Sequence, residues 1–124
     1  MDLIFLSLAV AENQPSVTAP NKTAMIKFSS LAEACNTPRN FIRQNAGAPT
    51  ADDEFNSLAL GIFAFQFKQN TAFANFCRSE NRTPDTIINW REIPAVPTRA
   101  FKSLDLTVLP KVDRKTVFRS SGTT

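Results

Sequence analysis

The sequence predicts an α/β chain, mostly helical up to about residue 90, then extended, with a short β-hairpin near its end. Three observations support this fold class. Apolar residues recur at a helical spacing from Phe55 to Phe76, and Pro94 and Pro97 exclude a helix interior. Two short apolar runs then flank a polar turn. A length of 124 residues with 43% apolar residues suits one modest domain.

The first 50 residues predict an N-terminal extension that is partly irregular. Residues 1–10, MDLIFLSLAV, resemble the apolar core of a signal peptide, but Asp2 stands where such peptides carry a positive charge. The run is too short to span a membrane, so we expect no membrane span. Residues 12–27, which contain two prolines among polar residues, are typical of a linker.

A short helical piece is expected after this linker. Ser30 and Glu33 have the spacing of a capping box, and Thr37-Pro38 suggests that the helix restarts with proline at its first position. The piece should end near Gly47.

The strongest local signal predicts one helix over residues 51–79, at the start of a second region, residues 51–124. Thr50 and Asp53 have the spacing of a cap, and three acidic residues favour the positive end of the helix dipole. The helix carries a broad face rich in phenylalanine, and burying each phenylalanine stabilises by roughly 2 kcal/mol. So wide a face needs more cover than a chain of this length is expected to offer.

The remaining elements are expected to be short. Residues 85–90 predict one helical turn, residues 93–98 an extended segment, and residues 100–102 another turn. Residues 106–109 and 115–118 predict two strands around the polar turn at 111–114.

The net charge of +3 is concentrated near the C-terminus. Residues 1–90 carry seven basic and eight acidic side chains, whereas residues 91–124 carry seven basic and three acidic ones. This placement favours an anionic ligand near the C-terminal end. Nucleic acid is not predicted, because the basic residues are scattered and the aromatic ones lie mostly in the preceding helix.

Residue types exclude several catalytic classes. The chain has no histidine, which excludes Ser-His-Asp and Cys-His catalysis and histidine metal sites within it. Cys35 and Cys77 lie far apart and form no CxxC motif. Both are expected to be free thiols, buried or half-buried, of a reducing compartment, which predicts a cytoplasmic protein.

The last eight residues, Val117-Phe118-Arg119-Ser120-Ser121-Gly122-Thr123-Thr124, have the composition of a strand that leads into a phosphate loop. Glycine allows backbone N–H groups to turn toward an anion, and the hydroxyl groups add short donors. A phosphate loop normally needs the element that follows it. We therefore expect that this chain is part of a longer protein, cut at its C-terminal end inside the loop.

Four stretches in fixed order resemble the N-terminal part of a LuxE-like acyl-protein synthetase, a branch of the adenylate-forming superfamily. The resemblance covers roughly residues 52–124, and the proline-rich third stretch at its distance from the fourth makes it more specific than the loop alone. The stretches are Phe55–Leu60 with Phe63–Gln66 and Asn70, then Phe76-Cys77, then Ile93–Thr98 with Phe101-Lys102, and finally Val117–Thr124.

The resemblance implies that a carboxylic acid, with fatty acids favoured, is activated with ATP to an acyl-adenylate and passed to a thiol. It implies a phosphate-loop role for Ser120, Ser121, Gly122, Thr123 and Thr124. Mg²⁺ would assist, although no ligand for it can be assigned, and no residue of this chain inherits a catalytic role. Residues 93–102 would brace the loop. The implied partners are ATP, the acid, and an acyl-acceptor, reductase or transferase protein.

Two other functions stay open. A phenylacetate–CoA-ligase-like enzyme would share the loop but use coenzyme A as the acyl acceptor. A non-enzymatic helical module would instead use the phenylalanine-rich helix to bind a partner protein.

Overall fold

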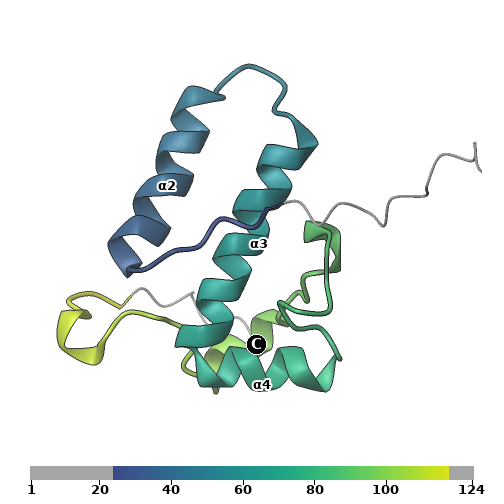
Figure 1. The fold of residues 1–124 in the computed structure, drawn as a ribbon. Coiled ribbons are helices and arrows are strands. Elements are labelled where there is room, and N and C mark those ends of the chain that lie inside the picture. Colours follow the sequence, from purple (N-terminus) through teal and green to yellow (C-terminus); the bar gives the residue numbers. More distant parts are fainter. Residues whose placement is uncertain (1–23, 118–124) are drawn as a thin grey trace, which may run out of the picture.

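The computed structural model describes residues 24–117. In this range the chain forms three α-helices, α2 (Leu31–Gln44), α3 (Asp52–Gln69) and α4 (Thr71–Ser79). Three short 3₁₀-helices follow, η1 (Trp90–Glu92), η2 (Thr98–Lys102) and η3 (Lys111–Asp113). Helix α2 runs along α3, and α4 turns across the end of α3 (Figure 1). The later segments pack around this helical centre.

Helix α3 occupies the centre because it is apolar on more than one side. Leu60 and Phe63 form the main core cluster with Phe73, Cys77 and Ile87. Phe63 contacts the ring of Phe73 edge-on, with 5.9 Å between ring centroids. The chain thus covers Phe63 and Phe73 with its own segments, whereas Phe55, also on the predicted face, stays 39% exposed.

The single helix predicted over residues 51–79 is interrupted at Asn70. Its backbone is extended, with φ −122° and ψ 105°, so α3 ends at Gln69 and α4 begins at Thr71. The side-chain oxygen of Asn70 accepts a hydrogen bond from the Phe73 N–H at 2.9 Å and caps α4. The interruption lets α4 fold back and cover the apolar face of α3.

A glycine allows the segment before α2 to lie against α3. A Cβ at Gly61 would collide with the backbone oxygen of Ile26, so only glycine permits this close approach. The Ile26 N–H donates to the carbonyl of Ser57, and Phe28 packs edge-on against Phe65. Residues 24–27, although part of the predicted linker, therefore lie against the core.

Helix α2 begins where the sequence predicts, and its interior differs from the prediction. The Ser30 hydroxyl accepts from the Glu33 N–H, and the Glu33 carboxylate accepts from the N–H and hydroxyl of Ser29. The two hydrogen bonds from Ser29 lower the pKa of the Glu33 carboxyl, and the bond from the Ser29 hydroxyl has the larger effect. Pro38 lies inside one continuous helix, so the predicted restart at Thr37-Pro38 is wrong. Cys35 is exposed rather than buried.

The start of α3 also differs in detail. Ala51 occupies the cap position without a side-chain hydrogen bond, so the predicted cap by Thr50 and Asp53 is not formed. The acidic residues Asp52, Asp53 and Glu54 do lie in the first turn, where they favour the positive end of the helix dipole.

The predicted α/β fold is wrong for the part of the chain that the structure describes. Residues 24–117 contain no β-strand, so the hairpin expected from 106–109 and 115–118 does not form within them. Of the extended segment predicted over 93–98, residues 94–97 are neither helix nor strand, whereas Thr98 already begins η2. The turn predicted at 100–102 is confirmed as part of η2. The polar turn at 111–114 becomes η3. Phe118 lies outside the described residues.

Side chains take the hydrogen bonds that a hairpin would have used. The Asn70 amide donates to the carbonyls of Asp105 and Thr107, and Arg114 donates to the carbonyl of Leu109. Pro110 has no N–H to offer a partner strand. An isolated two-stranded hairpin is marginally stable in water, so these contacts outweigh strand pairing.

Replacing Phe65 with Asp should unfold the chain, because this side chain is 8% exposed and an unpaired carboxylate would be buried. We expect a loss of about 4 kcal/mol or more, comparable to the whole stability of a small domain. Circular dichroism during urea unfolding measures it. Ile42→Asp is the control, since Ile42 is 67% exposed. Equal stability of the two variants would contradict the burial of Phe65.

Candidate functional site

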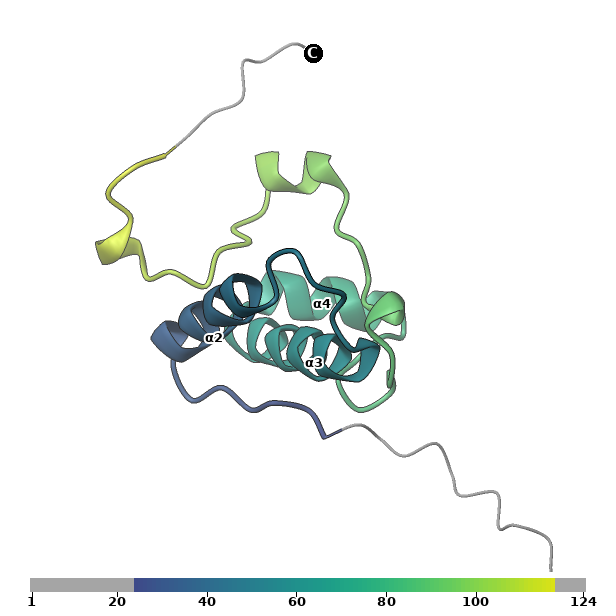
Figure 2. The same cartoon turned by 90° about the horizontal axis from the view of Figure 1, so that it is seen from above.

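The residues of the predicted phosphate loop, Ser120, Ser121, Gly122, Thr123 and Thr124, lie outside the described residues. The described residues end at Val117, three positions before Ser120. The site is therefore built from the segment that leads into it, residues 98–117, which we call the arch. In Figure 2 the arch rises from the helices at η2, returns to them and then turns outward at η3.

Asn70 joins the arch to the helices. Its side-chain nitrogen donates to the carbonyl oxygens of Asp105 and Thr107 at 3.1 and 3.2 Å, while its oxygen caps α4. The residue is 5% exposed, and its buried amide has a partner for both donor hydrogens and for its oxygen. A buried amide with every group paired gives a specific, rigid joint. The position of the arch relative to α3 and α4 is thus fixed at one point.

Arg114 closes the arch on itself. Its Nε donates to the Leu109 carbonyl at 2.9 Å, and one terminal nitrogen pairs with the Asp105 carboxylate at 2.9 Å. The hydrogen bond from Arg114 holds the pKa of Asp105 below its usual value. Because both side chains are partly exposed, the pair itself adds little global stability. It acts locally, holding residues 105–114 in one bend.

A broad groove runs along the arch and includes Val117 in its lining. It encloses about 680 Å³, within the range of small-molecule sites. Its lining combines five apolar side chains with two threonines, two basic residues and Asp105, which pairs with Arg114. The lining residues are Phe101, Leu104, Leu106, Leu109, Val117, Thr107, Thr116, Arg114, Lys115 and Asp105. Such a lining suits a ligand that has both an apolar part and a negative charge.

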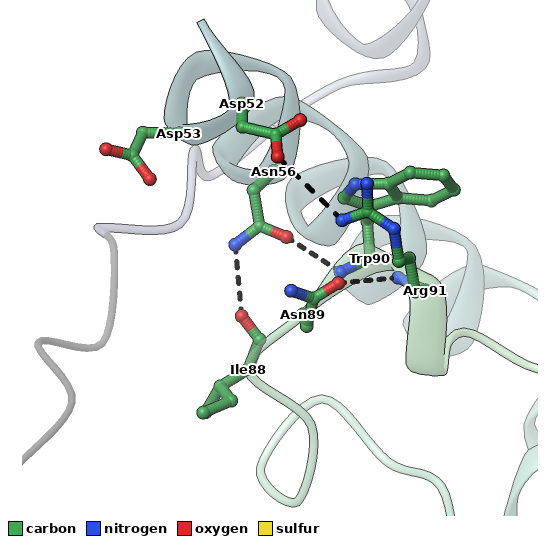
Figure 3. Close-up of a pocket in the computed structure, with 7 residues that line it drawn as sticks. All are labelled: Asp52, Asp53, Asn56, Ile88, Asn89, Trp90 and Arg91. Carbon is green, nitrogen blue, oxygen red and sulfur yellow. Dashed lines mark hydrogen bonds and ion pairs between the residues drawn. The ribbon is translucent and has the colours of Figure 1, made fainter.

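A second hollow of about 180 Å³ lies between the start of α3 and η1 (Figure 3). The Asn56 amide bridges the two elements, since its nitrogen donates to the Ile88 carbonyl and its oxygen accepts from the Trp90 N–H. Arg91 lies over the Trp90 ring and forms an exposed ion pair with Asp52 at 3.9 Å.

The second hollow has the features of a structural joint. Both hydrogen bonds of Asn56 hold η1 on α3, and the paired charges are exposed. The indole nitrogen of Trp90 is buried and has no partner among the described residues. The Phe55 ring packs edge-on against the Trp90 indole at 5.2 Å. We assign no chemistry to this hollow.

Sequence reasoning did not identify either buried asparagine as a structural residue. Asn56 and Asn70 belong to the stretches that carry the family resemblance, but no structural role was predicted for either residue. The available signal was a polar amide on an otherwise apolar helix face, which needs a hydrogen-bonding partner when buried. Their partners lie 32 to 37 residues away, so the sequence alone could not name them.

The cysteines and acidic residues offer no metal centre in residues 24–117, where no group of three or more potential ligands gathers. Both cysteines are free, as predicted, and burial raises the pKa of the Cys77 thiol. Among the described helices, none has the length and apolar character needed to cross a membrane.

Comparisons of this chain with protein-family models, curated proteins and solved structures find no match. The arch and its groove are therefore interpreted from their own geometry.

Replacing Asn70 separates its two functions. Asn70→Ala should lose both the helix cap and the donors to the arch, destabilising the protein by about 1–3 kcal/mol. Asn70→Asp keeps an oxygen to cap α4 but lacks the donor hydrogens. We expect it to preserve α4 while the amides of 104–109 exchange faster. Hydrogen exchange measures both effects, and slow exchange at 104–109 in both variants would contradict the joint.

The bend of the arch should open in acid. A lowered pKa means that the folded chain binds the Asp105 proton more weakly than the unfolded chain does. The stabilisation is therefore present above about pH 4 and is lost as pH falls through the lowered pKa. Backbone chemical shifts of 105–109, where Asp105 is the one acidic residue, should follow this titration when recorded from about pH 6 downward. In Asp105→Asn the titration should vanish, and its persistence would assign the change to another carboxylate.

Proposed function

We propose that this chain is part of an ATP-dependent enzyme that activates a carboxylic acid, with fatty acids favoured, as an acyl-adenylate. The acyl group then passes to a thiol. The observation that carries the proposal is the arch, which is hydrogen-bonded to α4 through Asn70 and precedes the predicted phosphate loop in the sequence. A loop gains affinity for its ligand when the preceding backbone is held in place.

Charge supports the same proposal. Residues 24–97 carry seven basic and seven acidic side chains, whereas the arch carries five basic and two acidic ones. The positive charge therefore lies in the segment that leads to the loop, where it would attract the triphosphate of ATP. Asp105, one of the two acidic residues, is paired with Arg114.

The loop residues would act on the departing pyrophosphate. In this proposal the N–H and hydroxyl groups of Ser120, Ser121, Thr123 and Thr124 donate where negative charge accumulates, and Gly122 lets the backbone approach the phosphates. Mg²⁺ would neutralise part of that charge. Residues 24–117 hold no cluster of potential metal ligands, so no residue among them is assigned to the ion.

The two proposed enzyme classes differ in the thiol that accepts the acyl group. A LuxE-like enzyme would carry the acyl group on its own cysteine, and a phenylacetate–CoA-ligase-like enzyme would transfer it to coenzyme A. Cys77 does not suit the first role, because it is buried and its pKa is raised, which disfavours the thiolate.

The substitution Gly122→Val in the protein that contains this chain should suppress acyl-adenylate formation, since a Cβ would strain the turn or block the phosphates. Thr123→Ala should be milder, losing one donor worth about 1–3 kcal/mol of transition-state stabilisation. Carboxylate-dependent ATP–pyrophosphate exchange measures this step apart from thiol acylation.

Thr71→Ala, an exposed position on α4, is the matched control and should leave the exchange unchanged. Normal exchange in folded Gly122→Val would remove the phosphate-loop assignment and with it the proposed reaction. Adding coenzyme A or protein thiols after adenylation then identifies the acceptor.

A further inference from the structure

The arch gathers exposed apolar side chains as well as charge. Eight large apolar residues are exposed in residues 24–117, and four of them lie in the arch. They are Phe101, Leu104, Val112 and Val117, with exposed fractions of 65%, 45%, 89% and 73%. Three of these four, all except Val112, line the groove described above. Apolar groups that gather in one groove, unlike single exposed residues, indicate a surface that binds something.

The groove is already shaped without a ligand. Asn70 holds the carbonyls of Asp105 and Thr107, and Arg114 holds that of Leu109, so the backbone along the groove is fixed. A fixed groove loses less conformational entropy on binding than a mobile loop does. The surface therefore has the order that a specific interface requires.

Of the three charged side chains that line the groove, Asp105, Arg114 and Lys115, only Lys115 has no ion-pair partner within residues 24–117. Arg114 is paired with Asp105, whereas Lys115 lines the groove and Lys102 follows Phe101 directly in η2. Neither lysine has an ion-pair partner within residues 24–117. A partner must then combine apolar side chains for the groove with acidic side chains for its edge.

We propose that the arch is a docking surface for an acidic amphipathic helix of another protein. A helix presents apolar side chains on one face at positions i, i+3 and i+4, and its glutamates on the flanks meet the lysines. The inference goes beyond the adenylation chemistry and does not require it. It also differs from a module that binds through the phenylalanine-rich helix, because Phe63, Phe65 and Phe73 are buried within the chain.

Other occupants fit less well. Single-stranded nucleic acid needs aromatic rings on which bases stack, and Phe101 is the one aromatic residue of the arch. A lipid surface suits protruding apolar side chains, whereas Phe101, Leu104 and Val117 face a shared hollow of about 680 Å³.

The test uses the full chain and a fluorescent peptide of about 18 residues, long enough to be helical. The peptide has leucine at the helical spacing on one face and glutamate elsewhere. Fluorescence anisotropy should show saturable binding that weakens as salt increases. A peptide with lysine in place of every glutamate should not bind.

Variants of the chain locate the binding surface. Phe101→Asp and Lys115→Glu should each weaken binding at least about tenfold. Both positions are exposed, so the fold should be retained, as circular dichroism can verify. Ile42→Asp is the matched control, because Ile42 is equally exposed but lies on α2, and it should bind normally.

Several outcomes would overturn the proposal. These are no binding of the acidic peptide, equal binding of both peptides, or equal affinities of Phe101→Asp and Ile42→Asp. Preferential binding to vesicles of phosphatidylcholine with phosphatidylserine would assign the groove to lipid instead, and concentration-dependent self-association through Phe101 would assign it to a second copy. Gly122→Val should leave peptide binding intact, which separates this inference from the adenylation chemistry.

Discussion

The buried amide of Asn70 determines how the two halves of the described chain are arranged. Its oxygen starts α4, its nitrogen holds two carbonyls of the arch, and its extended backbone turns α4 across the end of α3. Without this turn a single helix would leave the face around Phe63 uncovered. Because the amide is buried with all its groups paired, no other residue type supplies the same set of contacts. Packing of α4 and placement of the arch thus depend on one side chain.

A second buried amide, that of Asn56, attaches another segment near the start of α3. It hydrogen-bonds the carbonyl of Ile88 and the N–H of Trp90, the first residue of η1. The structure consequently attaches irregular segments to a helical centre through side chains rather than through a β-sheet. This arrangement explains why segments with strand-like sequence remain extended and unpaired. Three carbonyls at 105–109 accept hydrogen bonds from Asn70 and Arg114, which leaves fewer groups for a partner strand.

The arch relates these joints to the proposed functions. It carries the excess positive charge of the described residues, and it leads into the stretch Ser120–Thr124, whose phosphate-loop assignment stays a prediction. A rigid approach to the loop and a basic environment are what ATP chemistry would need. The apolar groove on the same segment is assigned to a protein partner because its exposed apolar side chains lie beside Lys115, which has no ion-pair partner within residues 24–117.

The sequence by itself determined the local features whose causes are local. The Ser30 cap, the acidic start of α3, the extended segment at Pro94 and Pro97 and the turn within η2 follow from neighbouring residues. Tertiary contacts decided the rest. The helix break at Asn70 and the absence of a hairpin within residues 24–117 depend on hydrogen bonds spanning 35 and 37 residues. An asparagine is compatible with a helix interior, a cap or a turn, so only its distant partners select among them.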